Sequence, residues 1–292
     1  MIRAVRRTSF TDARPVPLGW KSALLLTLLS VIGLGMFAWP LFAAAPTGTS
    51  GTSSAPFIFI VLLPLLVVLV LAQLNEHGMD TKALAILGVL SAVNAALRPL
   101  GAGTNGIETV FFLLILAGRV FGPGFGFVLG CTSMLASALL TAGVGPWMPF
   151  QMLASGWIGM FAGMLPDRLF GRPVRGKAEV GMLIVYGIVV AYVFGAIMNL
   201  WFWPFIAGAG TGSADLSYIP GGPLLQNLRH FFWYTLITST AVWDTGRAIT
   251  NTILLLLVGT PVLAAFRRTV RRANFDPQIS FEPERPGIVS GI

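Results

Sequence analysis

The feature that most constrains this sequence is a series of long apolar runs separated by short polar or glycine-rich segments. An α-helix needs about 20 apolar residues to cross the hydrocarbon core of a bilayer. Eight runs approach that length, namely residues 20–45, 56–74, 82–98, 107–118, 121–142, 147–166, 180–206 and 230–264. The fourth is short, so we expect it to tilt or to extend to Gly122. Because backbone polar groups in lipid must be satisfied within each segment, the sequence predicts an all-α integral membrane protein.

Composition excludes the alternative of a soluble fold. Hydrophobic residues make up 55% of the chain and charged residues only 10%, and the mean hydropathy is +0.80. Soluble domains carry about 25% charged residues. A soluble domain of this size could not remove so much apolar surface from water, because the ratio of surface to volume falls too slowly as a domain grows. A bilayer solvates that surface directly.

The lysines and arginines predict how the helices are oriented. If the N-terminus is cytoplasmic and all eight runs cross the membrane, every basic residue except Arg98, Arg229 and Arg247 falls in a terminal tail or an inner loop. Inner loops of membrane proteins carry an excess of Lys and Arg. We therefore expect a multi-pass membrane protein with both termini in the cytoplasm. Orientation and contact with anionic lipid explain the net charge of +8, so no nucleic-acid partner is expected.

Three regions are expected along the chain. Residues 1–79 comprise a basic cytoplasmic tail and two additional transmembrane helices, which are rich in Leu and Val and nearly free of polar side chains. Residues 80–272 form a core of six transmembrane helices. Residues 273–292 contain several prolines and no apolar period, so we expect a disordered cytoplasmic tail.

Polar and aromatic side chains gather on the side that is predicted to face outward. Three outer segments, residues 98–108, 143–151 and 207–229, are rich in glycine and proline. Converging loops over a helical bundle can cap a ligand cavity, in which aromatic faces supply contact area and a few polar groups fix orientation. The candidate binding residues beside these segments are Asn94, Arg98, Glu108, Trp147, Gln151 and Trp233. An aromatic belt at the membrane interface would explain the tryptophans equally well but the polar residues less well.

The last apolar run contains two ionisable residues. Asp244 and Arg247 are three positions apart and therefore share a helix face, where they can pair. Ionisable side chains within a membrane span are costly and are candidates for function. Two interpretations stay open: an internal ion pair that fixes this helix to a neighbour, or direct contact with a ligand. Both residues are therefore included among the candidate binding residues.

A stripe of small residues follows one face of the third run. Gly88, Ala92 and Ala96 are spaced four residues apart, so another helix backbone could pack closely against them. We interpret the stripe as a candidate docking surface for a partner subunit. Packing within the chain is at least as good an explanation.

Motifs for covalent catalysis are missing from the sequence. It contains no phosphate-binding Gly-x-x-x-x-Gly-Lys-Ser/Thr, no His-Glu-x-x-His and no Gly-x-Ser-x-Gly. There are two histidines, and Cys131 is the single cysteine. We therefore predict no catalytic residue, no metal site and no cofactor, which disfavours a membrane enzyme. A stand-alone secondary transporter stays possible, because such proteins use ionisable groups near the middle of the membrane.

Several segments resemble the substrate-binding S-components of energy-coupling factor (ECF) vitamin transporters. Residues 143–159, GVGPWMPFQMLASGWIG, resemble the central signature of that family, and residues 116–127, LAGRVFGPGFGF, resemble its inner turn. Residues 243–251, WDTGRAITN, followed by GTPV at 259–262, are similar to its last helix. The resemblance covers residues 80–272. The two N-terminal spans depart from the family's six-helix pattern.

The resemblance implies a location in a prokaryotic inner membrane, a function and a set of partners. It implies that residues 80–272 form a six-helix substrate-binding bundle that holds a vitamin beneath its outer loops. It also implies that the stripe of small residues docks a transmembrane coupling subunit (the T component), and that two separate ATPase subunits supply the energy. The central signature is most similar to the subgroup for cobalamin and related corrinoids, so a corrinoid is the expected ligand. Queuosine precursors and thiamine-related pyrimidines are the alternatives.

Overall fold

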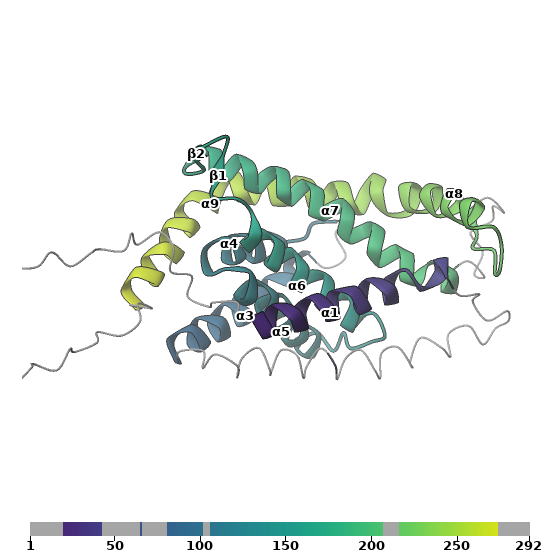
Figure 1. Cartoon of the computed structure of the whole chain (residues 1–292), viewed down its shortest axis with the longest axis horizontal. Coiled ribbons are helices and arrows are strands. Elements are labelled where there is room, and N and C mark those ends of the chain that lie inside the picture. The colour runs from purple at the N-terminus through teal and green to yellow at the C-terminus, as the bar shows by residue number, and fades with distance from the viewer. Residues whose placement is uncertain (1–19, 43–64, 66–80, 102–105, 207–215, 274–292) are drawn as a thin grey trace, which may run out of the picture.

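The computed structural model describes residues 20–42, 65, 81–101, 106–206 and 216–273. Figure 1 shows helices laid side by side along one long axis, with a two-stranded hairpin at one end. The elements are α1 (Trp20–Phe37), η1 (Trp39–Leu41), α3 (Thr81–Gly101), α4 (Phe111–Phe121), α5 (Pro123–Leu140), α6 (Met148–Met164), β1 (Arg168–Leu169), β2 (Arg172–Pro173), α7 (Lys177–Ile206), α8 (Leu224–Thr235), η4 (Leu236–Asp244) and α9 (Thr245–Ala273). The predicted all-α fold is confirmed.

The described helices also agree with a membrane location. Five stretches are long and apolar enough to span a bilayer, counted only over the residues described: Trp20–Phe37, Thr81–Gly101, Pro123–Leu140, Lys177–Phe205 and Leu224–Arg272. Helix α4 has 11 residues, in line with the short fourth run. The predicted span at 56–74 falls outside the described residues, except for residue 65.

The last helix begins earlier than the sequence predicts. Residues 207–229 were expected to form an outer loop, but α8 starts at Leu224 within that segment. Pro223 precedes the first turn, and the next six residues contain no helix breaker, which favours a helix start at this point. The chain then continues without interruption from α8 through η4, a π-helical segment, into α9. Residues 224–229 are therefore helical rather than part of a loop.

Glycines allow three core helices to approach closely. A Cβ atom at Gly118 or Gly126 would meet the backbone of Gly159 on α6, and one at Gly159 would meet the backbone of Gly126 on α5. Such backbone contact between membrane helices requires residues without side chains. The predicted inner turn is present between α4 and α5, where Gly122 has a φ of 98°, a conformation that glycine adopts readily.

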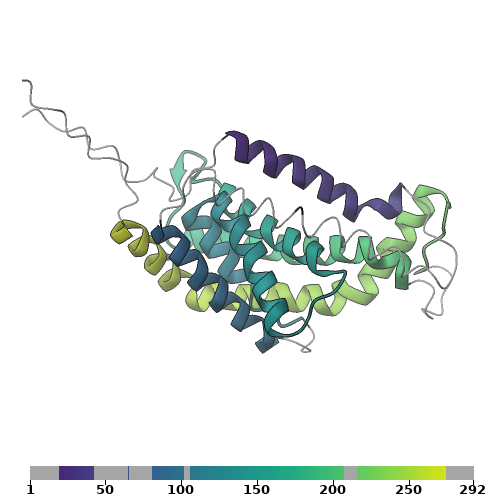
Figure 2. The same cartoon turned by 90° about the horizontal axis from the view of Figure 1, so that it is seen from below.

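Helix α1 packs against the core through polar and apolar contacts. Trp157 Nε1 on α6 donates a hydrogen bond to Ser30 Oγ at 2.9 Å, and Gly33 lies directly against the side chain of Leu153. Beyond α1, Trp39 Nε1 donates to the backbone oxygen of Trp201 on α7 at 3.0 Å. Figure 2 shows α1 running along the outside of the bundle.

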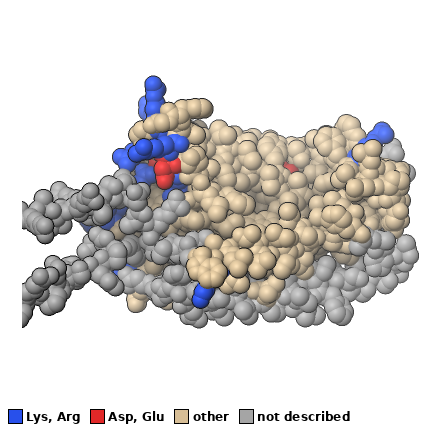
Figure 3. All heavy atoms as spheres, in the orientation of Figure 1, with Lys and Arg blue, Asp and Glu red and all other residues tan. Residues whose placement is uncertain are grey.

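Basic side chains gather at one end of the molecule, as Figure 3 shows. We call this the basic end; it comprises the β1–β2 hairpin, the start of α7 and the C-terminal part of α9. An ion-pair network with Arg119 and Glu179 buried at its centre joins these elements to α4. Arg119 contacts Glu179 at 2.9 Å and Asp167 at 2.8 Å, and Arg267 contacts the two oxygens of Glu179 at 2.6 and 2.8 Å. Glu179 therefore connects three elements that are far apart in the sequence.

Candidate functional site

A cavity of about 280 Å³ lies at the other end of the core helices from the basic end. It is enclosed by the end of α3, the loop before α4, the turn between α5 and α6, and the last helix around the start of α9. Four of the predicted binding residues line it, namely Arg98, Glu108, Trp147 and Arg247. The first two predicted outer segments thus converge on one cavity.

Arg98 and Gln151 are held together at the cavity wall. Arg98 Nη2 on α3 donates to Gln151 Oε1 in the first turn of α6 at 2.7 Å. A hydrogen bond from a guanidinium is stronger than one between neutral groups, so the pair fixes the position of the cation. Trp147 precedes α6 and is 43% exposed, which leaves part of its ring free beside the cavity.

Glu108 supplies a carboxyl group to the same cavity, from the loop between α3 and α4. Burial raises the pKa of Glu108 above its ordinary value. The cations of Arg247 and Arg98 and a backbone hydrogen bond at Val110 lower it, but they do not cancel the shift. The cavity therefore presents two cations and one carboxyl whose charge responds to pH.

Replacing Glu108 with glutamine is expected to flatten the dependence of stability on pH. Because the folded-state pKa is raised, the folded protein binds the proton more tightly, and stability falls as pH rises through that pKa. The Glu108→Gln variant should therefore melt at a higher temperature than the wild type above this pKa, and the difference should shrink as pH falls through it. Melting temperatures of both proteins across pH in one detergent test this. A constant difference would contradict it.

Asp244 positions Arg247 from the interior of the last helix. Arg247 Nη1 donates to Asp244 Oδ1 at 2.7 Å, and the fully buried carboxylate also accepts hydrogen bonds from Ser239 and Thr240. The carboxylate packs directly on Gly195 of α7, where a Cβ atom would collide with it. The guanidinium of Arg247 lies 5.1 Å from the ring centre of Phe194. The structure thus contains the ion pair that the first interpretation expected. The same pair holds Arg247 at the cavity, where the second interpretation expected a ligand contact.

Two lining residues, Thr141 and Trp243, were not predicted as binding residues and also lie outside the predicted outer segments. Trp243 is the residue before the last in the π-helical segment, and the wider turn of that segment changes the direction of its side chains. Its backbone lies directly against Gly106, which has a φ of 84° and has no room for a side chain. Within the WDTGR motif, the sequence predicted only the charged residues Asp244 and Arg247 as binding residues. Only the helix geometry shows that its tryptophan shares the cavity.

The chain matches the family described as ECF transporter, substrate-specific component, over residues 82–259. It belongs to this family. A curated relative, a UPF0397 protein of Lactobacillus johnsonii (strain CNCM I-12250 / La1 / NCC 533), is 26% identical over 200 residues, which are 67% of this chain and 94% of the relative. No solved structure matches the present chain. Membership makes the chain a substrate-specific membrane subunit of a transporter, in a family that acts with a coupling subunit and ATPases.

Four predicted binding residues of this substrate-specific component are not in the cavity lining. Gln151 and Asp244 accept hydrogen bonds from the lining arginines, whereas Asn94 and Trp233 do not. Asn94 is fully buried on α3, and its Nδ2 donates to Ser133 Oγ on α5 at 3.0 Å. Trp233 lies on α8, is 45% exposed, and contacts Phe232 edge to face. Asn94 thus links α3 to α5 by a hydrogen bond, and Trp233 lies on the exposed surface of α8. Neither is among the residues that line the cavity.

The predicted docking stripe lies on the outer surface of α3. Gly88, Ala92 and Ala96 are all exposed, and a Cβ atom at Gly88 would have no neighbour within 4 Å among the described residues. Of the two interpretations of this stripe, packing inside the chain finds no support in the described part of the structure. Within the same residues, no group of three or more His, Cys, Asp or Glu side chains is placed to hold a metal ion.

Proposed function

We propose that this chain is the substrate-binding subunit of an ATP-driven vitamin importer and that its ligand binds in the cavity between α3, α6 and α9. The observation that carries the proposal is the convergence of Arg98, Arg247 and Glu108 beside the exposed ring of Trp147. Two cations, a carboxyl and an aromatic face are the kinds of group that orient a small polar ligand with a ring. The hydrolysis of ATP is left to partner subunits.

The cavity faces the outside of the cell in this proposal. The basic end would lie in the cytoplasm, because Lys and Arg are retained on that side during membrane insertion. The cavity lies at the opposite ends of the same helices, where a nutrient would arrive. Both chain termini would then be cytoplasmic. The separation of basic residues in Figure 3 supports this orientation.

Two classes of ligand are candidates. The signature at residues 143–159 favours cobalamin or a related corrinoid. The volume of about 280 Å³ favours the smaller class, because pockets that enclose drug-sized ligands measure about 300–1,000 Å³. A corrinoid is larger than such ligands and would leave most of its surface outside the cavity. We therefore place thiamine-related pyrimidines and queuosine precursors ahead of corrinoids.

A binding screen separates these classes and tests the cavity. The purified full chain is titrated with thiamine, a queuosine precursor, cobalamin and cobinamide by calorimetry. With the ligand that binds, Trp147→Ala should weaken affinity about tenfold, as loss of an aromatic contact costs on the order of 1 kcal/mol. Trp233→Ala, which removes the same side chain outside the cavity, should change affinity less than about twofold. Equal losses, or no loss with Trp147→Ala, would rule out this cavity.

The stripe on α3 is proposed to dock the transmembrane coupling subunit. Its exposed small residues allow a partner helix to approach closely, so Ala92→Leu should hold the two helices apart. Assembly should weaken about tenfold, or about 1.4 kcal/mol, while vitamin binding stays intact. Ala265→Leu, the same change at an exposed position on α9, is the control. Co-purification with the coupling subunit measures both, and equal effects would contradict a docking role.

ATP dependence distinguishes the importer from a secondary transporter. Liposomes that contain the chain alone should not accumulate ligand when a proton or sodium gradient is applied. Accumulation should require the coupling subunit, the ATPases and ATP. Gradient-driven uptake by the chain alone would instead support the secondary transporter, with Asp244 and Arg247 as the natural candidates for ion coupling.

A further inference from the structure

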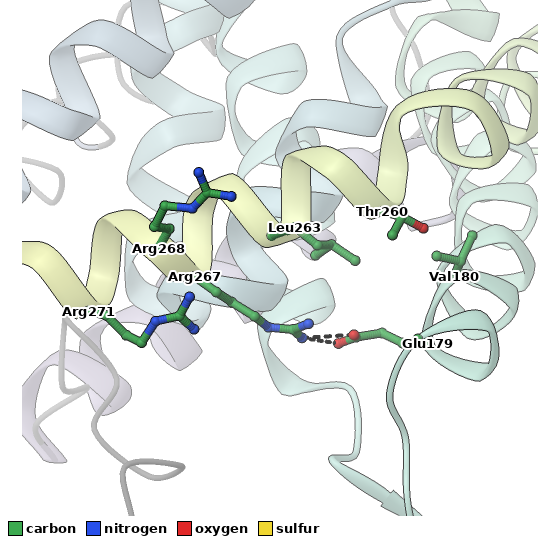
Figure 4. Close-up of a pocket in the computed structure, with 9 residues that line it drawn as sticks. Glu179, Val180, Thr260, Leu263, Arg267, Arg268 and Arg271 are labelled. Atoms are coloured by element: carbon green, nitrogen blue, oxygen red, sulfur yellow. Dashed lines mark hydrogen bonds and ion pairs between the residues drawn. The ribbon is translucent and has the colours of Figure 1, made fainter.

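A second cavity, of about 260 Å³, lies at the basic end between the start of α7 and the C-terminal half of α9. Figure 4 shows the two helices facing each other across it, with Arg267 extended from α9 to Glu179 on α7. One part of its lining is apolar and includes Val180, Leu263 and Ala264. The vitamin site uses none of these residues.

The cavity has an excess of positive charge. Three arginines line it, Arg267, Arg268 and Arg271, against one carboxylate, that of Glu179. That carboxylate is already shared, because it also accepts a hydrogen bond from the buried Arg119 at 2.9 Å. Neither Arg268 nor Arg271 forms an ion pair with any residue that the structure describes. Among the described residues, these two guanidinium groups thus have no counter-ion beside a partly apolar cavity.

We propose that this cavity binds the headgroup phosphate of an anionic phospholipid. Guanidinium groups form paired hydrogen bonds with phosphate oxygens, and no acid in the described part of the chain pairs with Arg268 or Arg271. The apolar part of the lining lies farther along α9 toward the middle of the helix, where it can contact the glycerol backbone and the first methylenes of the acyl chains. A free phosphate ion would gain nothing from that apolar wall. Basic pockets between transmembrane helices on the cytoplasmic side are suited to anionic lipid headgroups.

Glu179 gives the site its shape as well as part of its charge. Its two contacts with Arg267, at 2.6 and 2.8 Å, hold that guanidinium across the cavity between α7 and α9. Arg267 therefore forms one wall, while Arg268 and Arg271 remain available for a ligand. Arg267 and Arg268 are each three or four residues from both Ala264 and Arg271, so an arc of about 100° on α9 holds all four positions.

The charge of the helix end alone does not explain this arrangement. Cations near the C-terminus of a helix are stabilised by its dipole, and this effect applies to Arg271 and Arg272 alike. Both arginines are exposed, but Arg271 lines the cavity and Arg272 does not. The pair Arg272 and Arg175, both exposed at the basic end, therefore provides a control with the same loss of charge.

Native mass spectrometry of the full chain in detergent tests the proposal. The wild type, the Arg268→Gln/Arg271→Gln variant and the Arg272→Gln/Arg175→Gln control are titrated with phosphatidylglycerol, phosphatidylcholine and inorganic phosphate. The dissociation constant of the first phosphatidylglycerol should rise about tenfold or more in the cavity variant and less than about twofold in the control, since charge-assisted contacts depend on position. Matching melting temperatures of the three proteins show that the comparison concerns folded chains.

Three results would overturn the proposal. An equal loss in both variants would mean that lipid responds only to net charge. Equal binding of phosphatidylcholine would mean that an anionic headgroup is not recognised, and displacement of the lipid by inorganic phosphate would assign the cavity to a free anion. The experiment needs no vitamin, so its result is independent of the proposed transport function.

Discussion

Replacing Glu179 with alanine is expected to lower the free energy of unfolding by about 3 kcal/mol, because a buried cation then loses its partner. The side chains of Glu179 and Arg119 are only 1% and 4% exposed, and they meet at 2.9 Å. Removal of the carboxylate leaves the Arg119 guanidinium buried, with the Leu165 carbonyl and the exposed Asp167 as its partners. It also releases Arg267, whose ion pair is one of the contacts between α7 and α9. Urea titration of the detergent-solubilised chain, followed by tryptophan fluorescence, measures the loss.

The matched control uses the other acid that contacts Arg119. Asp167 lies 2.8 Å from the same guanidinium, but its side chain is 70% exposed. Exposed ion pairs contribute about 0–1 kcal/mol, so Asp167→Ala should cost no more than that. If both variants lose the same free energy, burial does not determine the strength of this network, and Glu179 is an ordinary surface partner.

The location of the candidate binding site could be predicted from the sequence, whereas this ion-pair network could not. Alternating helices bring every second loop to the same end of a bundle, so the order of apolar runs was enough to place Arg98, Glu108 and Trp147 together. The contact between Arg98 and Gln151 then follows from two helix ends that meet at that end. Topology alone therefore predicts a shared location, although it does not predict which side chains face the cavity.

Glu179 could not be identified in that way. Its partners Arg119 and Arg267 lie 60 and 88 positions away in the sequence, and Arg267 sits among other arginines that have no such role. Which of them reaches the carboxylate depends on how the helices rotate about their own axes. The π-helical segment of the last helix is equally hidden, because a change of hydrogen-bond register leaves no clear mark in composition. Trp243 was missed as a lining residue for this reason.

A methyl group at Gly159 is expected to be as damaging as the loss of Glu179. In the structure, a Cβ atom at this position would meet the carbonyl oxygen and Cα of Gly126, both backbone atoms of α5. A side chain can rotate away from an added methyl group, whereas a backbone can yield only if the whole helix moves. Overpacking of well-packed cores costs about 1–3 kcal/mol, and we expect Gly159→Ala to lie at the upper end. The urea midpoint of the variant measures this.

Gly181→Ala separates this effect from the general effect of adding alanine to a helix. Gly181 lies on α7, and a Cβ atom there would have no neighbour within 4 Å among the described residues. Alanine favours a helix over glycine by about 1 kcal/mol, so this control should be neutral or slightly stabilising. The two substitutions should thus differ in sign although their chemistry is identical. If Gly159→Ala also stabilises the protein, α5 and α6 do not touch through their backbones, and the close packing that brings residues 143–151 to the cavity mouth has another cause.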